Sequence, residues 1–377
     1  MTHPTCCYYK ETVLRRIVVN DFLTLQNGVE MNCVPGINVI IGENGTGKST
    51  LMKLIYAVRT SFDTEEYWLG ESQFAPPTFP PEGISEEEAD KMVLCDGVEH
   101  LPLRQYFDAD DESTNDVWLM RGELAKGSRY DYCREAHIDN DKAVLYFDVL
   151  DADNDETHDD AHCAIYIPEK DILSHSKGLL ALNTKRSIPF DKTYIDLLSS
   201  AELGRIREIP TYMIDLMNKL AQVTGGEVVY QNDQFYMKKA NGQLIPFSYE
   251  ASGLKRFGLL WQLIQNGQIQ SGNVLFWDEP DNSLNPMLMS KLAEVLMELS
   301  RHQIQIFIAT HNETLARCMA LHCKDGDSLM FHAMYRDEQQ MIRISSAPSF
   351  EQLDPNSLTG ARVKLYDAEM AKAFGYV

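Results

Sequence analysis

The stretch GENGTGKS, residues 42–49, fits the phosphate-loop pattern GxxxxGK[ST] and decides the fold of this chain. PGINVIIG (35–42), which leads into it, predicts a buried β-strand. STLMKLIYAV (49–58), which follows it, has apolar residues at helical spacing. A strand, a glycine-rich loop and a helix in immediate succession predict an α/β protein with a phosphate site at the end of a strand.

The residue types of this loop suit a nucleoside triphosphate. Glycines let backbone N–H groups wrap a phosphate, and the positive end of the helix dipole favours the same negative charge. Lys48 would hold the β- and γ-phosphates of ATP during catalysis, and Ser49 would bind Mg²⁺. The candidate ATP-binding residues of the loop are Gly42, Glu43, Asn44, Gly45, Thr46, Gly47, Lys48, Ser49 and Thr50.

Two later apolar stretches end in groups that suit phosphate chemistry. NVLFWDEP (273–280) predicts a strand whose Asp278 would hold Mg²⁺ through water and whose Glu279 would act as general base. QIFIATHN (305–312) predicts a strand that delivers His311 to the γ-phosphate, where it would report the loss of that group. The simpler alternatives are an exposed acidic turn after the first strand and a structural histidine after the second.

Composition excludes few classes of protein. The formal net charge of −22 opposes direct binding to nucleic acid unless a partner supplies positive charge. No apolar run approaches the roughly 18 residues of a membrane span, and the start of the chain lacks the apolar core of a secretory signal. The 8 cysteines form no CxxC pair, which favours reduced thiols. We therefore expect a cytoplasmic protein with no membrane partner.

Pattern changes along the chain predict four segments: an N-terminal ATPase part, an insertion with irregular and helical structure, a C-terminal ATPase part and a helical tail. Their expected bounds are 1–61, 62–225, 226–347 and 348–377. Within the insertion, AVLYFDVL (143–150) and AHCAIYIP (161–168) are expected to be the two strands of an acidic hairpin.

With these motifs in order, the chain resembles the ABC-type ATPase heads of the SMC, RecF and OLD-like proteins. The resemblance is carried by VVNDF (18–22), GENGTGKST (42–50), FWDEPDNSLNP (276–286) and IFIATHN (306–312), and more weakly by YIPEKDILSH (166–175). It implies an α/β P-loop NTPase of ABC-head type, with a mixed sheet and an inserted irregular or helical lobe. The implied cofactors are ATP and Mg²⁺. This chain is similar to the compact members, which lack a Toprim domain and a long coiled coil.

The resemblance also implies a signature segment just before a helix, and SYEASGLKRFG (248–258) occupies that place. In the family, serine and glycine at this helix start bind the γ-phosphate that a second subunit holds. Ser252 and Gly253 are the candidates, although a different register puts Ala251 at the family serine. The simpler alternative is an ordinary helix that Ser252 caps.

Two further positions of the family pattern lie near ATP. Asn282 stands in the loop after DEP, where the family usually has aspartate. The family also has a glutamine after the first helix that senses Mg²⁺ and water, and Gln73 and Gln105 are the candidates here.

The function implied by the resemblance is an ATPase that forms a homodimer or higher oligomer on ATP and acts as sensor or scaffold. It would control a separate effector, a nuclease or toxin of a bacterial phage-defence system, and would meet nucleic acid only through that partner. The alternatives are the motor subunit of a membrane transporter and an ATPase of DNA repair.

Two metal patterns are weaker. Asp151, Asp153 and Asp155 resemble the start of a calcium loop, but Glu156 replaces the required glycine. Cys318, His322 and Cys323, with His311, are close in sequence, but their spacing fits no standard zinc site. We expect neither metal.

Overall fold

The computed structural model describes residues 13–20, 22, 24–25, 28–60, 92–95, 119–124, 132–138, 141–148, 164–186 and 190–374. Its strands are β1 (Val13–Asn20), β2 (Val29–Asn32), β3 (Ile37–Gly42), β4 (Met92–Cys95), β5 (Leu119–Leu124), β6 (Tyr132–Ile138), β7 (Asp141–Asp148), β8 (Ala164–Ile167), β9 (Gly226–Gln231), β10 (Gln234–Lys239), β11 (Leu244–Pro246), β12 (Val274–Asp278), β13 (Gln305–Thr310), β14 (Leu329–Arg336) and β15 (Ile342–Ala347). Its α-helices are α1 (Lys48–Thr60), α3 (Leu179–Lys185), α4 (Lys192–Glu202), α5 (Thr211–Thr224), α6 (Ser252–Gln265), α7 (Pro286–Arg301), α8 (Glu313–His322) and α9 (Ser357–Ala373). Short 3₁₀ helices are η2 (Leu173–His175), η3 (Phe247–Tyr249) and η4 (Phe350–Gln352).

A 6-stranded mixed sheet with the order β15-β14-β3-β13-β12-β8 positions the predicted site. All its neighbours pair in parallel except β15, which pairs antiparallel with β14 at one edge. The strand β13 lies between β3 and β12, so the carboxyl ends of the three motif-bearing strands meet at one edge of the sheet. This arrangement is the expected α/β phosphate-loop ATPase fold of ABC-head type.

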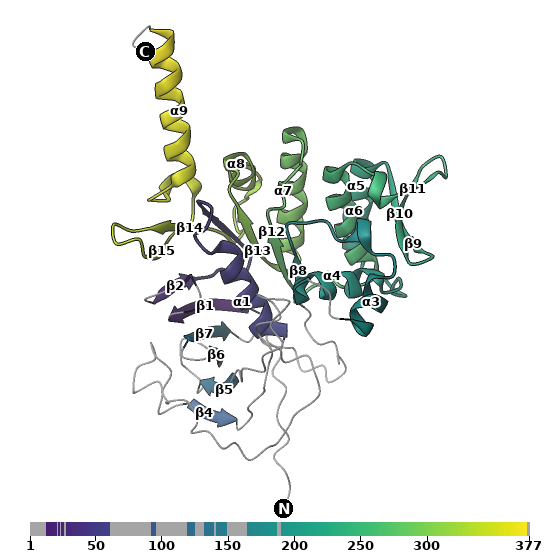
Figure 1. Ribbon diagram of the computed structural model, residues 1–377, viewed down its shortest axis with the longest axis horizontal. Coiled ribbons are helices and arrows are strands. Elements are labelled where there is room, and N and C mark those ends of the chain that lie inside the picture. Colours follow the sequence, from purple (N-terminus) through teal and green to yellow (C-terminus); the bar gives the residue numbers. More distant parts are fainter. Residues whose placement is uncertain are drawn as a thin grey trace, which may run out of the picture.

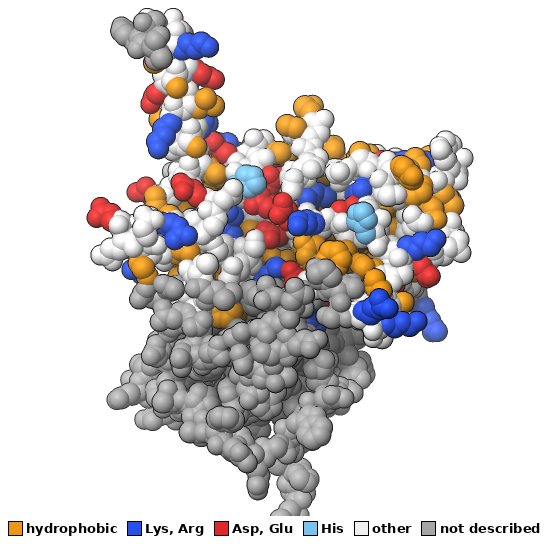
Figure 2. All heavy atoms as spheres, in the orientation of Figure 1, with side chains coloured by type: hydrophobic (Ala, Val, Ile, Leu, Met, Phe, Trp, Pro, Cys, Tyr) orange, Lys and Arg blue, Asp and Glu red, His pale blue; other side chains and the backbone are white. Residues whose placement is uncertain are grey.

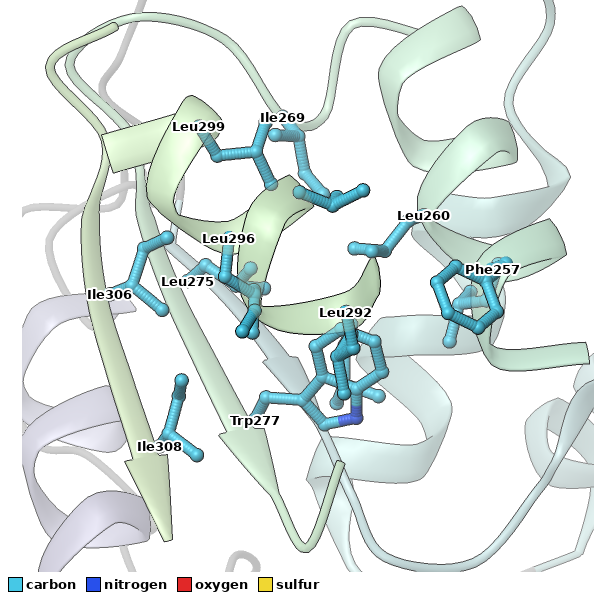
Figure 3. Close-up of a cluster of buried hydrophobic side chains, with 14 of the residues drawn as sticks. Phe257, Leu260, Ile269, Leu275, Trp277, Leu292, Leu296, Leu299, Ile306 and Ile308 are labelled. Atoms are coloured by element: carbon cyan, nitrogen blue, oxygen red, sulfur yellow. The ribbon is translucent and has the colours of Figure 1, made fainter. Parts of the chain in front are cut away.

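Side chains of the central strands alternate between two cores, one on each face of the sheet. On β3, Val39 and Ile41 pack with α6, α7 and α8, whereas Ile40 packs with α1 and β1. Figure 1 shows α1 on one side of the central strands and α7 and α8 on the other. Burial on both faces explains why the motif-bearing strands read as continuous apolar runs instead of alternating ones. Figure 3 shows the first core, where Trp277, Leu292 and Ile308 lie fully buried.

A second 6-stranded sheet, β2-β1-β7-β6-β5-β4, is antiparallel throughout. The buried side-chain amide of Gln305, on β13 of the central sheet, joins strand β1 of this second sheet to the central sheet. Gln305 Oε1 accepts a hydrogen bond from Leu14 N at 2.9 Å, and Nε2 donates to Leu14 O and Val34 O at 2.8 Å each. Because a buried amide is costly unless it is hydrogen-bonded, these three bonds fix the position of β1 against β13.

The predicted acidic hairpin is wrong in its pairing. Both of its strands exist, as β7 and β8, but β7 pairs with β1 and β6 whereas β8 pairs with β12 in the central sheet. The reason lies in the burial of β8: Ala164 and Tyr166 pack into one core, and Ile165 and Ile167 into the other. A strand that is buried on both faces needs a place inside a covered sheet. The acidic residues between the two strands lie outside the described residues.

The two sheets also bear on the expected segments. The antiparallel sheet combines strands from 1–61 with strands from 62–225, and the central sheet takes β8 from 62–225. The division of the chain into four segments stays a prediction.

Two local features, the turn at Asn241-Gly242 and the cap of α7, follow from their residue types. The turn joins β10 to β11 in a third, 3-stranded sheet, and Gly242 has a φ of 83° there, which glycine adopts without strain. At the start of α7, Asn285 Oδ1 accepts a hydrogen bond from Met287 N at 3.0 Å, and Pro286 opens the helix.

The last helix, α9, projects from the body of the protein and has no buried residue. It begins at Ser357, where Asn356 Oδ1 accepts a hydrogen bond from Thr359 N at 3.2 Å and caps the helix. Figure 2 shows hydrophobic and charged side chains around this helix. Among the helices in the described ranges, none is both long and apolar enough to cross a membrane.

Candidate nucleotide-binding site

The phosphate loop connects β3 to α1 at the edge where the central strands end. A side chain at Gly42 would place its Cβ 2.3 Å from the carbonyl oxygen of Met334 on the neighbouring strand β14. Gly47 has a φ of 86°, and a Cβ there would lie 2.9 Å from the side chain of Leu25. Both positions therefore require glycine, and they hold the loop close against the sheet and the N-terminal segment.

Lys48 lies over this loop. Its Nζ donates hydrogen bonds to the carbonyl oxygens of Gly42 at 3.0 Å and Glu43 at 3.1 Å. Burial lowers the pKa of Lys48, and the nearby carboxylates of Glu279 and Asp278 raise it. The ammonium group thus sits between the loop and the two acids, where it would meet the phosphates of a bound nucleotide.

Asp278 ends β12 and is only 7% exposed. The hydroxyl of Tyr166 donates to its Oδ2 at 3.3 Å, and the hydroxyl of Ser49 lies near enough to this carboxylate to lower its pKa. Burial raises the pKa of Asp278, whereas the hydroxyls of Ser49 and Tyr166 lower it.

The other oxygen of Asp278 fits a magnesium site. Within the described part of the chain, no group donates a hydrogen bond to the buried atom Oδ1. An unpaired buried carboxylate oxygen is costly, and Mg²⁺ binds such oxygens through one or two carboxylates, with waters and substrate phosphates completing its shell. Asp278 and the adjoining hydroxyl of Ser49 therefore fit Mg²⁺ bound together with nucleotide.

The predicted base and the predicted sensor are in direct contact. His311 Nδ1 lies 2.8 Å from Glu279 Oε2, and Glu279 N donates to Ala309 O at 2.9 Å. Glu279 has a φ of 48°, a backbone conformation that non-glycine residues seldom adopt. Burial raises the pKa of Glu279, and His311 lowers it. A carboxylate in contact with an imidazole at the end of the sheet can accept a proton from a water beside it.

A third acid, Asp281, was not recognised in the sequence. Thr310 Oγ1 donates to Asp281 Oδ1 at 2.6 Å and in turn accepts a hydrogen bond from Asn312 N at 3.0 Å. Both side chains are buried, so this pair ties the loop after β12 to the end of β13. The signal was present as the third acid of the run DEPD, two residues after the predicted base.

The signature-like segment is placed at the bare start of α6. Ala251 occupies the cap position, so the alternative in which Ser252 caps the helix is wrong, because Ser252 is already the first helical residue. Ser252 is exposed, and among the described residues none accepts a hydrogen bond from the amides of Ser252 and Gly253. Gly253 is buried, and a Cβ on it would lie 3.1 Å from Leu284.

Two basic residues of α6 hold neighbouring loops in place. Arg256 Nε donates to the carbonyl oxygen of Asn282 at 2.9 Å, and its Nη2 donates to that of Glu169 at 3.2 Å. Asn282 Nδ2 also donates to Glu169 Oε1 at 2.9 Å. Lys255 Nζ reaches Asp171 Oδ2 at 3.1 Å. The loop after β12, the loop after β8 and the start of α6 therefore form one connected unit.

A cavity of about 260 Å³ lies within this unit. Its apolar lining includes Leu173, Phe247 and Leu259, and its polar lining includes Ser252 and Arg256. This hollow is separate from the phosphate loop, none of whose residues lines it. The start of α6 and the loops beside it thus present a hollowed surface instead of a flat one.

Other candidates of the sequence do not join the site. Gln73, Gln105 and the calcium-like run at 151–162 lie outside the described residues. Of the residues in the weak zinc pattern, His322 has its Nε2 2.8 Å from Ser290 Oγ. Across the described ranges, no three side chains of His, Cys, Asp or Glu are grouped to hold a metal ion.

Comparison with known proteins identifies a family. The family model described as "AAA domain, putative AbiEii toxin, Type IV TA system" matches residues 122–317, just over half of the chain. No curated protein matches the chain.

Solved structures with a similar chain path include SMC head domains and an ATP-binding cassette of an ABC transporter. The SMC head domain from Thermotoga maritima is 14% identical, with 89% of this chain and 98% of that chain covered and a TM-score of 0.42. A Smc head domain from Pyrococcus furiosus, bound to the C-terminal domain of ScpA, is 11% identical, with 94% and 99% covered and a TM-score of 0.41. MJ1267, an ATP-binding cassette of an ABC transporter, is 12% identical, with 90% and 92% covered and a TM-score of 0.39. The strand order and the phosphate loop described above, and not these weak likenesses, identify the fold.

Proposed function

Since the chain belongs to this family of AAA-domain proteins and is an ATP-binding ATPase head of the ABC and SMC-like type, we propose that it hydrolyses ATP, dimerises around ATP and controls a separate effector. The observation that carries the first part is the contact of 2.8 Å between His311 and Glu279, at the sheet edge that also holds the phosphate loop and Asp278. A base, its orienting partner, a cation and a metal-binding acid converge there from three adjacent strands.

The residues divide the work of hydrolysis as follows. The loop amides and Lys48 hold the phosphates, and Glu279 accepts the proton of the water that attacks the γ-phosphorus while the bond to the β–γ bridging oxygen breaks. His311 keeps the carboxylate of Glu279 in place and reaches the γ-phosphate from its exposed side, since its side chain is 57% exposed. Mg²⁺, held by Ser49 and Asp278, would neutralise charge on the β- and γ-phosphates when bound.

The second part of the proposal concerns the start of α6. The exposed Ser252 and the free amides of Ser252 and Gly253 are suited to the γ-phosphate of ATP that a second copy of the chain holds. Two large apolar side chains flank this helix start: Tyr249 in η3 and Met287 at the start of α7 are each 82% exposed. Exposed apolar residues beside a polar helix end suit a face that a second protein surface covers.

The third part is the effector. The family description names a toxin and a toxin–antitoxin system, and this supports a role in which the ATP-bound dimer restrains or releases a toxin or nuclease partner. A bacterial phage-defence system is the setting we propose, in which slow hydrolysis times a change of conformation. With a net charge of −22, the chain would meet nucleic acid only through such a partner.

The test of hydrolysis is the variant Glu279→Gln. Loss of the base should lower ATP turnover by at least about 100-fold while ATP stays bound, because amide and carboxylate have the same shape. Glu294→Gln is the matched control, since Glu294 pairs with Lys219 and Lys291 on the surface and should leave turnover unchanged. Phosphate release and retention of labelled ATP are measured together. Equal turnover by the two variants, or a wild-type chain without Mg²⁺-dependent turnover, would refute the proposal.

A further inference from the structure

Tyr166 is buried beside the carboxylate of Asp278, and it opens the segment YIPEKDILSH (166–175), in which the family resemblance assigns no role to it. It lies near the end of β8, the edge strand that pairs in parallel with β12, directly opposite Phe276. Its side chain is 1% exposed, and its hydroxyl donates to Asp278 Oδ2 at 3.3 Å. Because β8 and β12 run in the same direction, the phenol reaches the end of β12 along the face of the sheet that packs against α1.

The ring of Tyr166 has little freedom to turn away. It packs with two other rings that also touch each other: the centroid of Tyr56 is 5.5 Å away at 55°, and that of Phe276 is 6.3 Å away at 18°. A close-packed ring in such a cluster holds its hydroxyl at one place. The hydroxyl therefore acts as a fixed donor.

The two oxygens of Asp278 consequently have different surroundings. Oδ2 accepts from Tyr166, whereas the buried Oδ1 receives no hydrogen bond from any described residue. A fixed bond to one oxygen sets the rotation of the carboxylate plane and aims the other oxygen. Partners of this kind, which touch a metal ligand and not the metal, orient that ligand and raise the affinity of a site.

We propose that Tyr166 is a positioning residue of the magnesium site, which binds Asp278 Oδ2 so that Oδ1 faces Mg²⁺ or a water of its shell. This role rests on the proposed binding of ATP with Mg²⁺ and adds a residue to it. The phenol contacts neither nucleotide nor metal, and its effect passes through Asp278 alone.

The chain offers a matched control in the same ring cluster. The hydroxyl of Tyr56 also binds a carboxylate, since it donates to Asp196 Oδ2 at 3.0 Å on α4. Tyr166→Phe and Tyr56→Phe therefore remove the same atom from neighbouring rings, and each change breaks a hydrogen bond to an aspartate. They differ in whether that aspartate belongs to the metal site.

The experiment measures metal and nucleotide binding separately on the full chain. Mn²⁺ replaces Mg²⁺, and its binding in the presence of a non-hydrolysable ATP analogue is followed by electron paramagnetic resonance. Binding of the analogue in EDTA is measured on the same samples. We expect Tyr166→Phe to weaken Mn²⁺ binding about tenfold, with analogue binding in EDTA unchanged. Tyr56→Phe should leave both quantities at the wild-type values.

Three results would overturn the role of Tyr166. They are an unchanged Mn²⁺ affinity in Tyr166→Phe, equal weakening in both variants, and parallel losses of Mn²⁺ and of analogue binding in EDTA, which would indicate general damage to the site. A wild-type chain that binds no nucleotide would instead refute the proposed function itself and, with it, this role. Melting temperatures of both variants distinguish loss of folding from loss of the metal site.

Discussion

The edge that carries the phosphate loop and the start of α6 are both suited to phosphate, yet they are built in opposite ways. At the loop, Lys48 and Asp278 are each 7% exposed, and the base Glu279 is in contact with His311. At the start of α6, Ser252 is exposed and the first amides of the helix have no acceptor among the described residues. The first region is complete within one chain, and the second offers only donors.

The difference supports two separate proposed roles, which are nucleotide binding at the loop edge and assembly of two chains at α6. The groups proposed to bind Mg²⁺ and activate water are held by buried contacts inside one chain. The amides at the start of α6 are proposed to bind the phosphate of a second chain, and Arg256 nearby donates hydrogen bonds to the backbone of two loops. The account therefore assigns nucleotide binding to the loop edge and assembly to α6.

Of two substitutions that distinguish the two regions, Arg256→Ala should have the larger effect. That effect should fall on assembly. Loss of its bonds to Asn282 and Glu169 frees the loop after β12 and the start of α6, so ATP-driven assembly should weaken about tenfold. Nucleotide binding by the single chain should change less than about twofold, because Arg256 does not bind the phosphate loop. Sedimentation and nucleotide titration on one preparation give both values.

Arg317→Ala is the control for this variant, since Arg317 pairs with Glu313 on α8. It should leave assembly unchanged. A loss of nucleotide binding in Arg256→Ala that equals its loss of assembly would erase the contrast between the two regions.

Asp278→Asn tests the loop edge and should have a smaller effect. This effect should fall on the stability of the chain. Burial raises the pKa of Asp278 above its ordinary value of 3.8, so the folded chain holds a proton there more tightly than the unfolded chain. Its contribution to stability is therefore present at low pH and is lost as pH rises through the raised pKa. The amide carries no charge, and the variant should exceed the wild type in free energy of unfolding by about 1 kcal/mol at neutral pH.

This prediction is checked by melting the nucleotide-free chain in EDTA between pH 4 and pH 8. The advantage of Asp278→Asn should grow from about pH 4 upward and disappear when ATP and Mg²⁺ are added, because only the wild type binds the metal. A variant that is less stable than the wild type at neutral pH would mean that the carboxylate supports the fold instead of the ligand.

The sequence predicted the loop edge well because its parts are local. Residues 42–49 form one continuous motif, and Asp278, Glu279 and His311 each follow an apolar strand whose burial is readable from its composition. The pairing of these strands then follows from the rule that parallel strands present their carboxyl ends together.

Tyr166 and Glu169 were missed because they reach the site through a strand pairing that periodicity does not reveal. The bond from Tyr166 to Asp278 joins residues 112 positions apart. The same lack of information on strand pairing led to the incorrect hairpin, because the composition of a short apolar strand does not show which strand it pairs with. What β8 does carry is burial on both faces, which suits the central sheet and no two-stranded hairpin.

The central claim is that the γ-phosphate of ATP on the phosphate loop of one chain is also bound by the start of α6 of a second chain. It is tested most directly by the mass of Glu279→Gln in solution, measured by light scattering with and without ATP and Mg²⁺. The account predicts one chain of 42.9 kDa without nucleotide and twice that mass with it, and no doubling when ATP is replaced by ADP. A mass that does not respond to ATP, while bound ATP is present in the same sample, would contradict it.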